Sequence, residues 1–159
     1  MEKLLNILDE ELNLYKTALE LSNNKTVLLK ENKVKELESM TKEEESLVAT
    51  IIEKEKERIQ EVKNICKQYG KPESSLKIEE LCEFIEGSKE ELLDYKKEII
   101  KVLEELKNVN KINSSLINSS LEYINFTVNM LTETSKNPVY QPGGFQENKA
   151  QRNLFDIKL

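Results

Sequence analysis

Residues 88–135 read SKEELLDYKKEIIKVLEELKNVNKINSSLINSSLEYINFTVNMLTETS and contain neither proline nor glycine. The stretch begins with Ser88 and, three residues later, Glu91, which is the pattern of a capping box. One helix over all of these residues would run for roughly 70 Å, at ~1.5 Å per residue. A chain of 159 residues cannot bury such a helix completely. Part of its apolar surface must therefore contact another element or another molecule.

The composition indicates a single all-α domain. Charged residues make up 34% of the chain, with only 4 glycines and 3 prolines. Leu, Glu, Lys and Ile dominate, and most of these residues favour helices. With 38% hydrophobic residues and no tryptophan, the core must consist mainly of Leu and Ile at helical spacing.

The N-terminal half predicts two long helices separated by a bend. Apolar residues keep to one helical face from residue 1 to about residue 29, and a bend or short helix is expected within 30–40. Thr41 followed by Glu44 is a second capping box, so the second long helix is predicted to begin there. Gly70 and the proline after it predict its end.

A short helix is expected between the second long helix and the last one. Its apolar residues are at helical spacing, and they would close one end of a bundle: Leu76, Ile78, Leu81, Cys82 and Ile85. Cys66 and Cys82 lie 16 positions apart on helical segments. We interpret both as small core residues and expect no disulfide.

These segments predict an elongated antiparallel helical bundle. It comprises two long N-terminal helices, a short connecting helix and one long C-terminal helix. The bundle is expected to occupy residues 1–137, because Asn137-Pro138 ends the last periodic segment. Residues 138–159 are short of apolar side chains until Leu154, which predicts a flexible tail with short docking motifs.

The last long helix changes character along its length. Its first half has an apolar seam, predicted as Leu92, Ile99, Leu103 and Leu106. In its second half the same seam alternates with polar residues, while apolar groups spread around the helix. Such a mixed surface is typical of a protein interface. Alternatively, Asn and Ser face water there or set the register of a packed seam.

Several classes of function are disfavoured. A net charge of −6, with lysines interleaved among glutamates, argues against nucleic-acid binding. No apolar run is long enough for a membrane span, so we expect no membrane insertion and a cytoplasmic location. The chain has no histidine and no phosphate-binding or nucleophile motif. We therefore expect no catalysis and no metal or other cofactor.

Taken together, these features resemble the FlgN family of flagellar type III export chaperones. The N-terminal part carries the weaker resemblance, in L-x-x-E-L-x-x-Y at residues 8–15 and the glutamate-rich stretch that Arg58 closes. LKNVNKINSSLINSSLEY, residues 106–123, is similar to the family's N-x-x-N followed by paired apolar residues. Tyr140 with Gly144 resembles its Y-x-x-x-G element, although Gln141-Pro142 departs from the pattern. The closing LFDIKL resembles the L-x-D-x-K ending of some members.

The resemblance implies a chaperone for hook-associated proteins, which form the junction between hook and filament. Their C-terminal helical segments would bind the last long helix, at Asn110, Asn113, Leu116, Ile117, Leu121, Tyr123 and Ile124. The cytosolic domain of the export gate is the second implied partner, and it would contact Tyr140 and Gly144. We expect the free chaperone to be a monomer or a weak dimer.

The sequence allows one rival interpretation and disfavours a second. In the first, the protein is a homo-oligomeric coiled-coil scaffold whose seam pairs with its own copy. In the second, the protein is an enzyme or metal carrier built from helix-borne carboxylates, as in di-iron bundles, but such sites need Glu-x-x-His pairs and this chain has no histidine.

Overall fold

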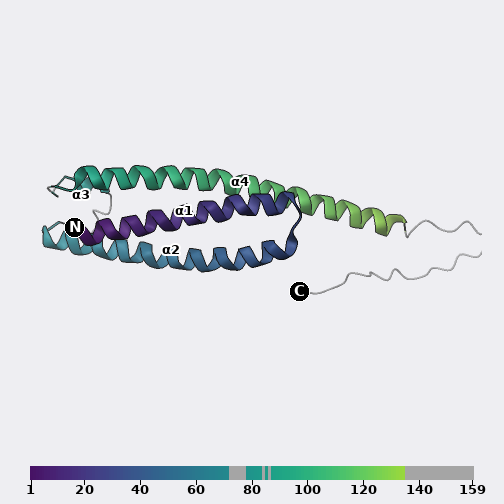
Figure 1. Cartoon of the computed structure of the whole chain (residues 1–159), viewed down its shortest axis with the longest axis horizontal. Coiled ribbons are helices and arrows are strands. Elements are labelled where there is room, and N and C mark those ends of the chain that lie inside the picture. Colours follow the sequence, from purple (N-terminus) through teal and green to yellow (C-terminus); the bar gives the residue numbers. More distant parts are fainter. Residues whose placement is uncertain (72–77, 84, 86, 135–159) are drawn as a thin grey trace, which may run out of the picture. The chain divides into compact units, whose positions relative to one another are not determined.

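A computed structural model describes residues 1–71, 78–83, 85 and 87–134 of the chain. Its helices are α1 (Glu2–Lys30), α2 (Val34–Gln68), α3 (Ile78–Leu81) and α4 (Lys89–Thr134), and no strand occurs among the described residues (Figure 1). The predicted all-α class and the order of its helices are confirmed. The chain divides into one unit of Met1–Glu122 and a second unit, Tyr123–Leu159, whose described residues 123–134 belong to α4.

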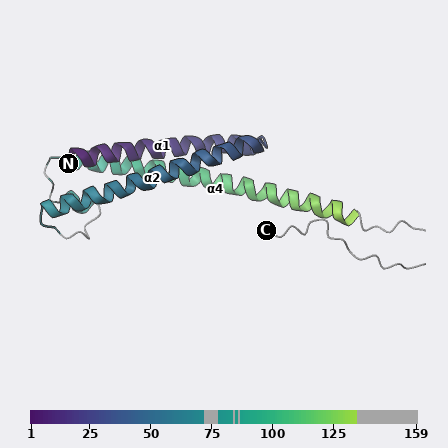
Figure 2. The same ribbon diagram turned by 90° about the horizontal axis from the view of Figure 1, so that it is seen from below.

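Within residues 1–122, α1 lies beside both α2 and α4 (Figures 1 and 2). α1 and α2 are antiparallel: Lys3 pairs with Glu61 near one end, and Lys25 pairs with Glu44 near the other. α1 and α4 run in the same direction. Their contacts advance together, from Asp9 with Tyr95 to Thr26 with Asn113.

The core is concentrated at the end of this unit that holds the N-terminus. One buried cluster joins all four helices: Leu4, Leu8, Val62, Ile65, Cys66, Leu81, Cys82, Ile85 and Leu92. A smaller cluster follows, formed by Leu12, Tyr15 and Val102 with Ile51 and Ile99 packed against it. The short connecting segment therefore closes the end of the bundle, as its apolar spacing predicts. Cys66 and Cys82 are both buried, as predicted for core residues, and the structure has no disulfide between them.

The turn between α1 and α2 lies within residues 30–40, where a bend is predicted. It is confined to residues 31–33, where Asn32 adopts a left-handed φ of 54° and the Lys33 N–H donates to the Leu28 carbonyl. Asparagine tolerates this conformation better than most residues. α2 then begins at Val34, so Thr41 lies in the helix interior and the capping box predicted at Thr41 is wrong.

The hydroxyl of Thr41 donates to the Leu37 carbonyl, 2.9 Å away, one turn back in the same helix. Thr41→Ala should therefore change the free energy of unfolding by no more than about 0.5 kcal/mol, as expected for an exposed helix position. Loss of a true cap would cost about 1 kcal/mol. Urea denaturation distinguishes an interior position from a cap. A loss of free energy well above about 0.5 kcal/mol would contradict the helix start at Val34.

The end of α2 agrees with the sequence. α2 stops at Gln68, and Gly70 follows with a left-handed φ of 62°. The Lys71 N–H donates to the Cys66 carbonyl, and the Gly70 N–H donates to that of Lys67, which is the hydrogen-bond pattern of a glycine-terminated helix.

α4 begins at Lys89, directly after Ser88, and the predicted seam agrees with the structure at Leu92, which is buried, and at Ile99 and Leu106, which are half-buried. Val102 is buried and Leu103 is exposed, whereas the prediction placed Leu103 in the seam. The seven-residue pattern continues to the buried Asn113. The error arises because adjacent apolar residues, here Val102 and Leu103, leave the helical phase ambiguous. The boundary predicted at residue 138 and the tail beyond it lie outside the described residues.

Candidate partner-binding site

The second half of α4 exposes most of its apolar side chains. In the first unit these are Ile112, Ile117 and Leu121, and in the second unit they are Tyr123, Ile124, Phe126, Val128, Met130 and Leu131. Leu116, which follows the buried Asn113 by three positions, is half-buried. Four of the residues that the sequence predicts for partner binding, Ile117, Leu121, Tyr123 and Ile124, are therefore accessible.

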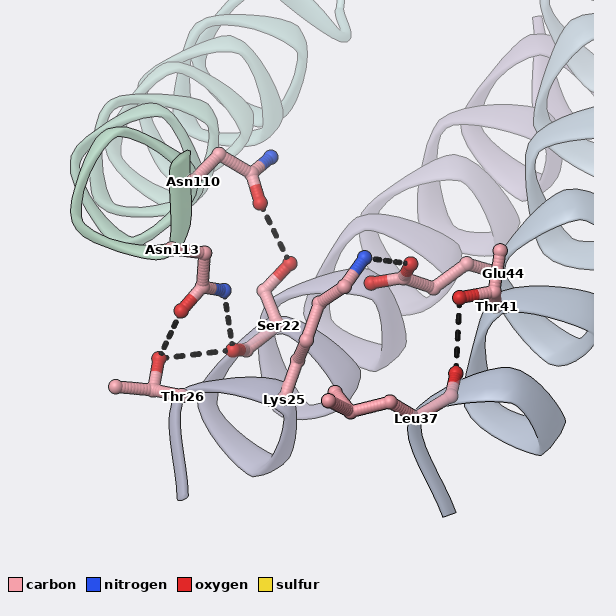
Figure 3. Close-up of polar contacts among 8 residues, drawn as sticks. All are labelled: Ser22, Lys25, Thr26, Leu37, Thr41, Glu44, Asn110 and Asn113. Atoms are coloured by element: carbon pink, nitrogen blue, oxygen red, sulfur yellow. Dashed lines mark hydrogen bonds and ion pairs between the residues drawn. The ribbon is translucent and has the colours of Figure 1, made fainter. Parts of the chain in front are cut away.

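Asn113 has a different environment, because its side chain is only 3% exposed and contacts α1 (Figure 3). Its Nδ2 donates to the carbonyl of Ser22 at 2.9 Å, and its Oδ1 accepts from the Thr26 hydroxyl at 2.6 Å. The Thr26 hydroxyl also lies 3.1 Å from the Ser22 carbonyl. Both ends of the amide are thus paired, as a buried polar group requires.

Asn110 makes a further contact with the same turn of α1. Its Oδ1 accepts a hydrogen bond from the hydroxyl of Ser22 at 2.9 Å (Figure 3). We refer to Ser22, Thr26, Asn110 and Asn113 as the α1–α4 polar clamp. Two of the residues predicted for partner binding therefore take part in contacts between α1 and α4, which agrees with the alternative that the asparagines set a register. The sequence offers no signal that pairs them with Ser22 and Thr26, some 90 residues away.

The same turn of α1 also contacts α2. Lys25 lies between Ser22 and Thr26 in sequence and pairs with Glu44 of α2 (Figure 3). The polar run at residues 22–26 thus supplies contacts to both neighbouring helices, while α1 continues unbroken to Lys30.

A second polar layer joins α1 to α2 inside the bundle. Glu11 is only 2% exposed, and its Oε1 accepts from Nε of Arg58 at 3.0 Å. Burial raises the pKa of Glu11, and the charge and hydrogen bond of Arg58 oppose this change. The hydroxyl of Tyr15 donates to Glu55 at 2.7 Å. The pKa of Tyr15 is raised mainly by burial and further by the carboxylate of Glu55.

The two acidic residues of this layer, Glu11 and Glu55, each have a partner on the facing helix. The layer is therefore a structural feature that holds α1 against α2. Over residues 1–71, 78–83, 85 and 87–134, no group of three or more Cys, Asp or Glu side chains could hold a metal ion. No described helix is long and apolar enough to cross a membrane. Tyr140 and Gly144 lie outside the described residues.

The fold and this site define a class: an all-α bundle protein whose longest helix leaves an apolar surface uncovered. The chain belongs to the FlgN family, since residues 1–148 match the family described as FlgN protein. It is also 29% identical over 147 residues to the "Uncharacterized protein YvyG" of Bacillus subtilis (strain 168), covering 91% of this chain and 90% of that protein. No solved structure matches it significantly. Membership of the family supports a role as a flagellar export chaperone that binds hook-associated proteins.

Proposed function

We propose that the protein binds the C-terminal helical segments of hook–filament junction proteins, keeps them from assembling early and delivers them to the type III export gate in the cytoplasm. The family match supports the flagellar role. The observation that carries the binding step is the exposure of Ile117, Leu121, Tyr123 and Ile124 on α4. We call the bound junction protein the client.

The exposed side chains suit a helical client. Ile117 and Leu121 are four residues apart and both belong to the first unit, so they form a stripe on one face of α4. An amphipathic segment can fold against such a stripe and bury the surface that would otherwise drive its assembly. The client must be ordered on binding, which offsets part of the gain and keeps the complex reversible.

Asn110 and Asn113 belong to the proposed site in a supporting role, since they hold α4 against α1. Leu116 is half-buried and follows Asn113 on the same side of the helix. Delivery to the gate is proposed for Tyr140 and Gly144 on the strength of their resemblance to the family's tail element alone.

Polar substitution of the stripe tests client binding. Ile117→Asp and Leu121→Asp should each weaken binding of a recombinant client C-terminal segment by about 10-fold to 100-fold, because each buried aliphatic side chain contributes ~1.5–3 kcal/mol. Isothermal titration calorimetry measures the change. Ser119→Asp is the matched control, since Ser119 is an exposed residue of α4 that is not apolar, and it should leave affinity unchanged.

Unaltered affinity in both stripe variants, with normal helicity by circular dichroism, would reject this site. Sedimentation of the isolated protein tests the rival scaffold function, because the same exposed residues could pair with a second copy. A tight dimer that dissociates in Leu121→Asp would favour the scaffold over the chaperone.

A further inference from the structure

A second apolar surface lies on α2, on a different helix from the proposed client stripe. Val62 is 2% exposed, but the exposed fraction rises toward the start of α2, to 37% at Ile59, 46% at Ile52 and 52% at Val48. Ile59 lies three residues before Val62 and seven after Ile52. Val48 precedes Ile52 by four, so these side chains share one face of the helix. We call Val48, Ile52 and Ile59 the α2 strip.

The same face is covered toward the end of α2. Val62 and Cys66 belong to the buried cluster that includes Leu81, Cys82 and Ile85 of the connecting segment. The α2 strip therefore continues a buried face past the point where the chain's own elements cover it. An exposed continuation of a core face is typical of a surface that packs against a further molecule.

The edge of the strip that lies toward α1 is engaged within the chain. Glu44 lies four residues before Val48, and it pairs with Lys25 of α1. Glu55 lies three residues after Ile52, and its carboxylate accepts the hydrogen bond of Tyr15. Both carboxylates of this edge therefore have their partners on α1.

The outer edge of the strip carries charges of both signs in a fixed order. Glu45 lies three residues before Val48, and Lys63 lies four residues after Ile59. Lys56 lies between them. Within the part of the chain that the structure describes, Glu45, Lys56 and Lys63 take part in no ion pair. The strip thus has an acidic residue available at its start and a basic residue available at its end.

A second copy of this chain matches both ends of the strip at once. The midpoint of Val48 and Ile59 falls between residues 53 and 54, and the midpoint of Glu45 and Lys63 falls at residue 54. Two α2 helices that pack antiparallel about this point bring Val48 of each copy to Ile59 of the other. The same arrangement brings Glu45 of each copy to Lys63 of the other, because a twofold axis repeats every contact. A partner of uniform charge would match only one end.

We propose that the α2 strip is the interface of a twofold-symmetric, antiparallel dimer of this chain. The pairs of Glu45 with Lys63 fix its direction and register, since charge complementarity contributes more to specificity than to affinity. The apolar contact has three side chains per copy. This is small beside the ~800 Å² per partner of a standard stable interface, so the dimer is weak. It uses no residue of the client stripe and does not depend on the proposed function.

Sedimentation equilibrium of the full chain tests this dimer. The wild type should pass from monomer to dimer between about 10 µM and 1 mM, as expected for a small interface. Glu45→Lys and Lys63→Glu should each weaken self-association about 10-fold, because each variant places like charges together at both ends of the interface. Glu20→Lys is the matched control, since it makes the same change of charge at an exposed position of α1. It should leave association unchanged.

A mixture of the two charge variants tests the antiparallel register. The strip of the Glu45→Lys variant has a lysine at each end, and the strip of the Lys63→Glu variant has a glutamate at each end. Each end of a mixed dimer therefore unites opposite charges again. The mixture should associate about as tightly as the wild type, although each variant alone associates weakly.

Four results would overturn the inference. The wild type stays monomeric up to about 1 mM. The mixture associates no more tightly than either charge variant alone, which rejects the register. The dimer persists in Ile52→Asp/Ile59→Asp with normal helicity by circular dichroism, which places it on another surface. The dimer dissociates in Leu121→Asp, which places its interface on α4.

Discussion

Arg58→Ala is expected to lower the free energy of unfolding by about 2–3 kcal/mol at pH 7. Removing one partner of a buried ion pair commonly costs 3–5 kcal/mol, because an uncompensated charge stays inside. The lower figure allows for the side chain of Arg58, which is 28% exposed, while that of Glu11 is 3% exposed. Water can enter where the guanidinium was and solvate part of the remaining carboxylate.

This loss should depend on pH in a defined direction. The pKa of Glu11 is raised by burial, and Arg58 opposes that change. A carboxyl whose folded-state pKa is raised contributes most to stability below its unfolded pKa, and the contribution is lost as pH rises through the folded pKa. Arg58→Ala removes the opposing charge, so the pKa of Glu11 rises further. The deficit should therefore be small at about pH 4 and should grow toward pH 7, as measured by urea denaturation across this range.

The control is a double-mutant cycle with Glu11→Gln, which keeps the shape of the side chain and removes its charge. Glu11→Gln/Arg58→Ala should recover most of the stability lost by Arg58→Ala at pH 7, because no buried charge remains. A deficit that is equal at pH 4 and pH 7, or is unchanged in the double variant, would show that Arg58 acts through its packing instead.

The sequence predicts the helices well because hydrophobic spacing and helix breakers are local signals. α1, the end of α2 and the start of α4 all follow from them. The start of α2 does not, because a threonine followed by a glutamate fits two situations. Thr41 could accept a backbone N–H at a helix start, or donate to a carbonyl one turn back, as it does. Residues 34–40, the seven before Thr41, are helical although no side chain caps the start of α2.

The candidate site shows a different limit. The Asn- and Ser-rich half of α4 is recognisable as unusual from sequence, and the exposure of Ile117 and Leu121 agrees with an interaction surface. The α1–α4 polar clamp is not predictable in the same way. Its partners on α1, Ser22 and Thr26, look like ordinary polar residues of a helix, and only the packing of α1 against α4 brings them to Asn113.

Asn113→Ala should lower the free energy of unfolding by about 2 kcal/mol, since it removes two hydrogen bonds, each contributing ~1 kcal/mol, and opens space beside α1. Residues 110–122 of α4 should also exchange amide hydrogens faster, because the clamp holds this part of the helix. Chemical denaturation and hydrogen exchange measure the two effects. Ser119→Ala, which changes an exposed residue of the same helix, should alter neither.

A second variant tests whether Asn113 also contacts the client. It restores the stability of the protein but lacks the side-chain amide of Asn113. Thr26→Val/Asn113→Leu replaces both partners with apolar groups of similar size, an exchange that can be nearly neutral, so most of the lost stability should return. If Asn113 acts by anchoring α4, client affinity returns with it. If affinity stays low while stability and exchange rates recover, Asn113 touches the client itself. We expect recovery of affinity, because the side chain of Asn113 is only 3% exposed and both its Oδ1 and its Nδ2 are held by α1, which leaves a partner almost no surface to contact.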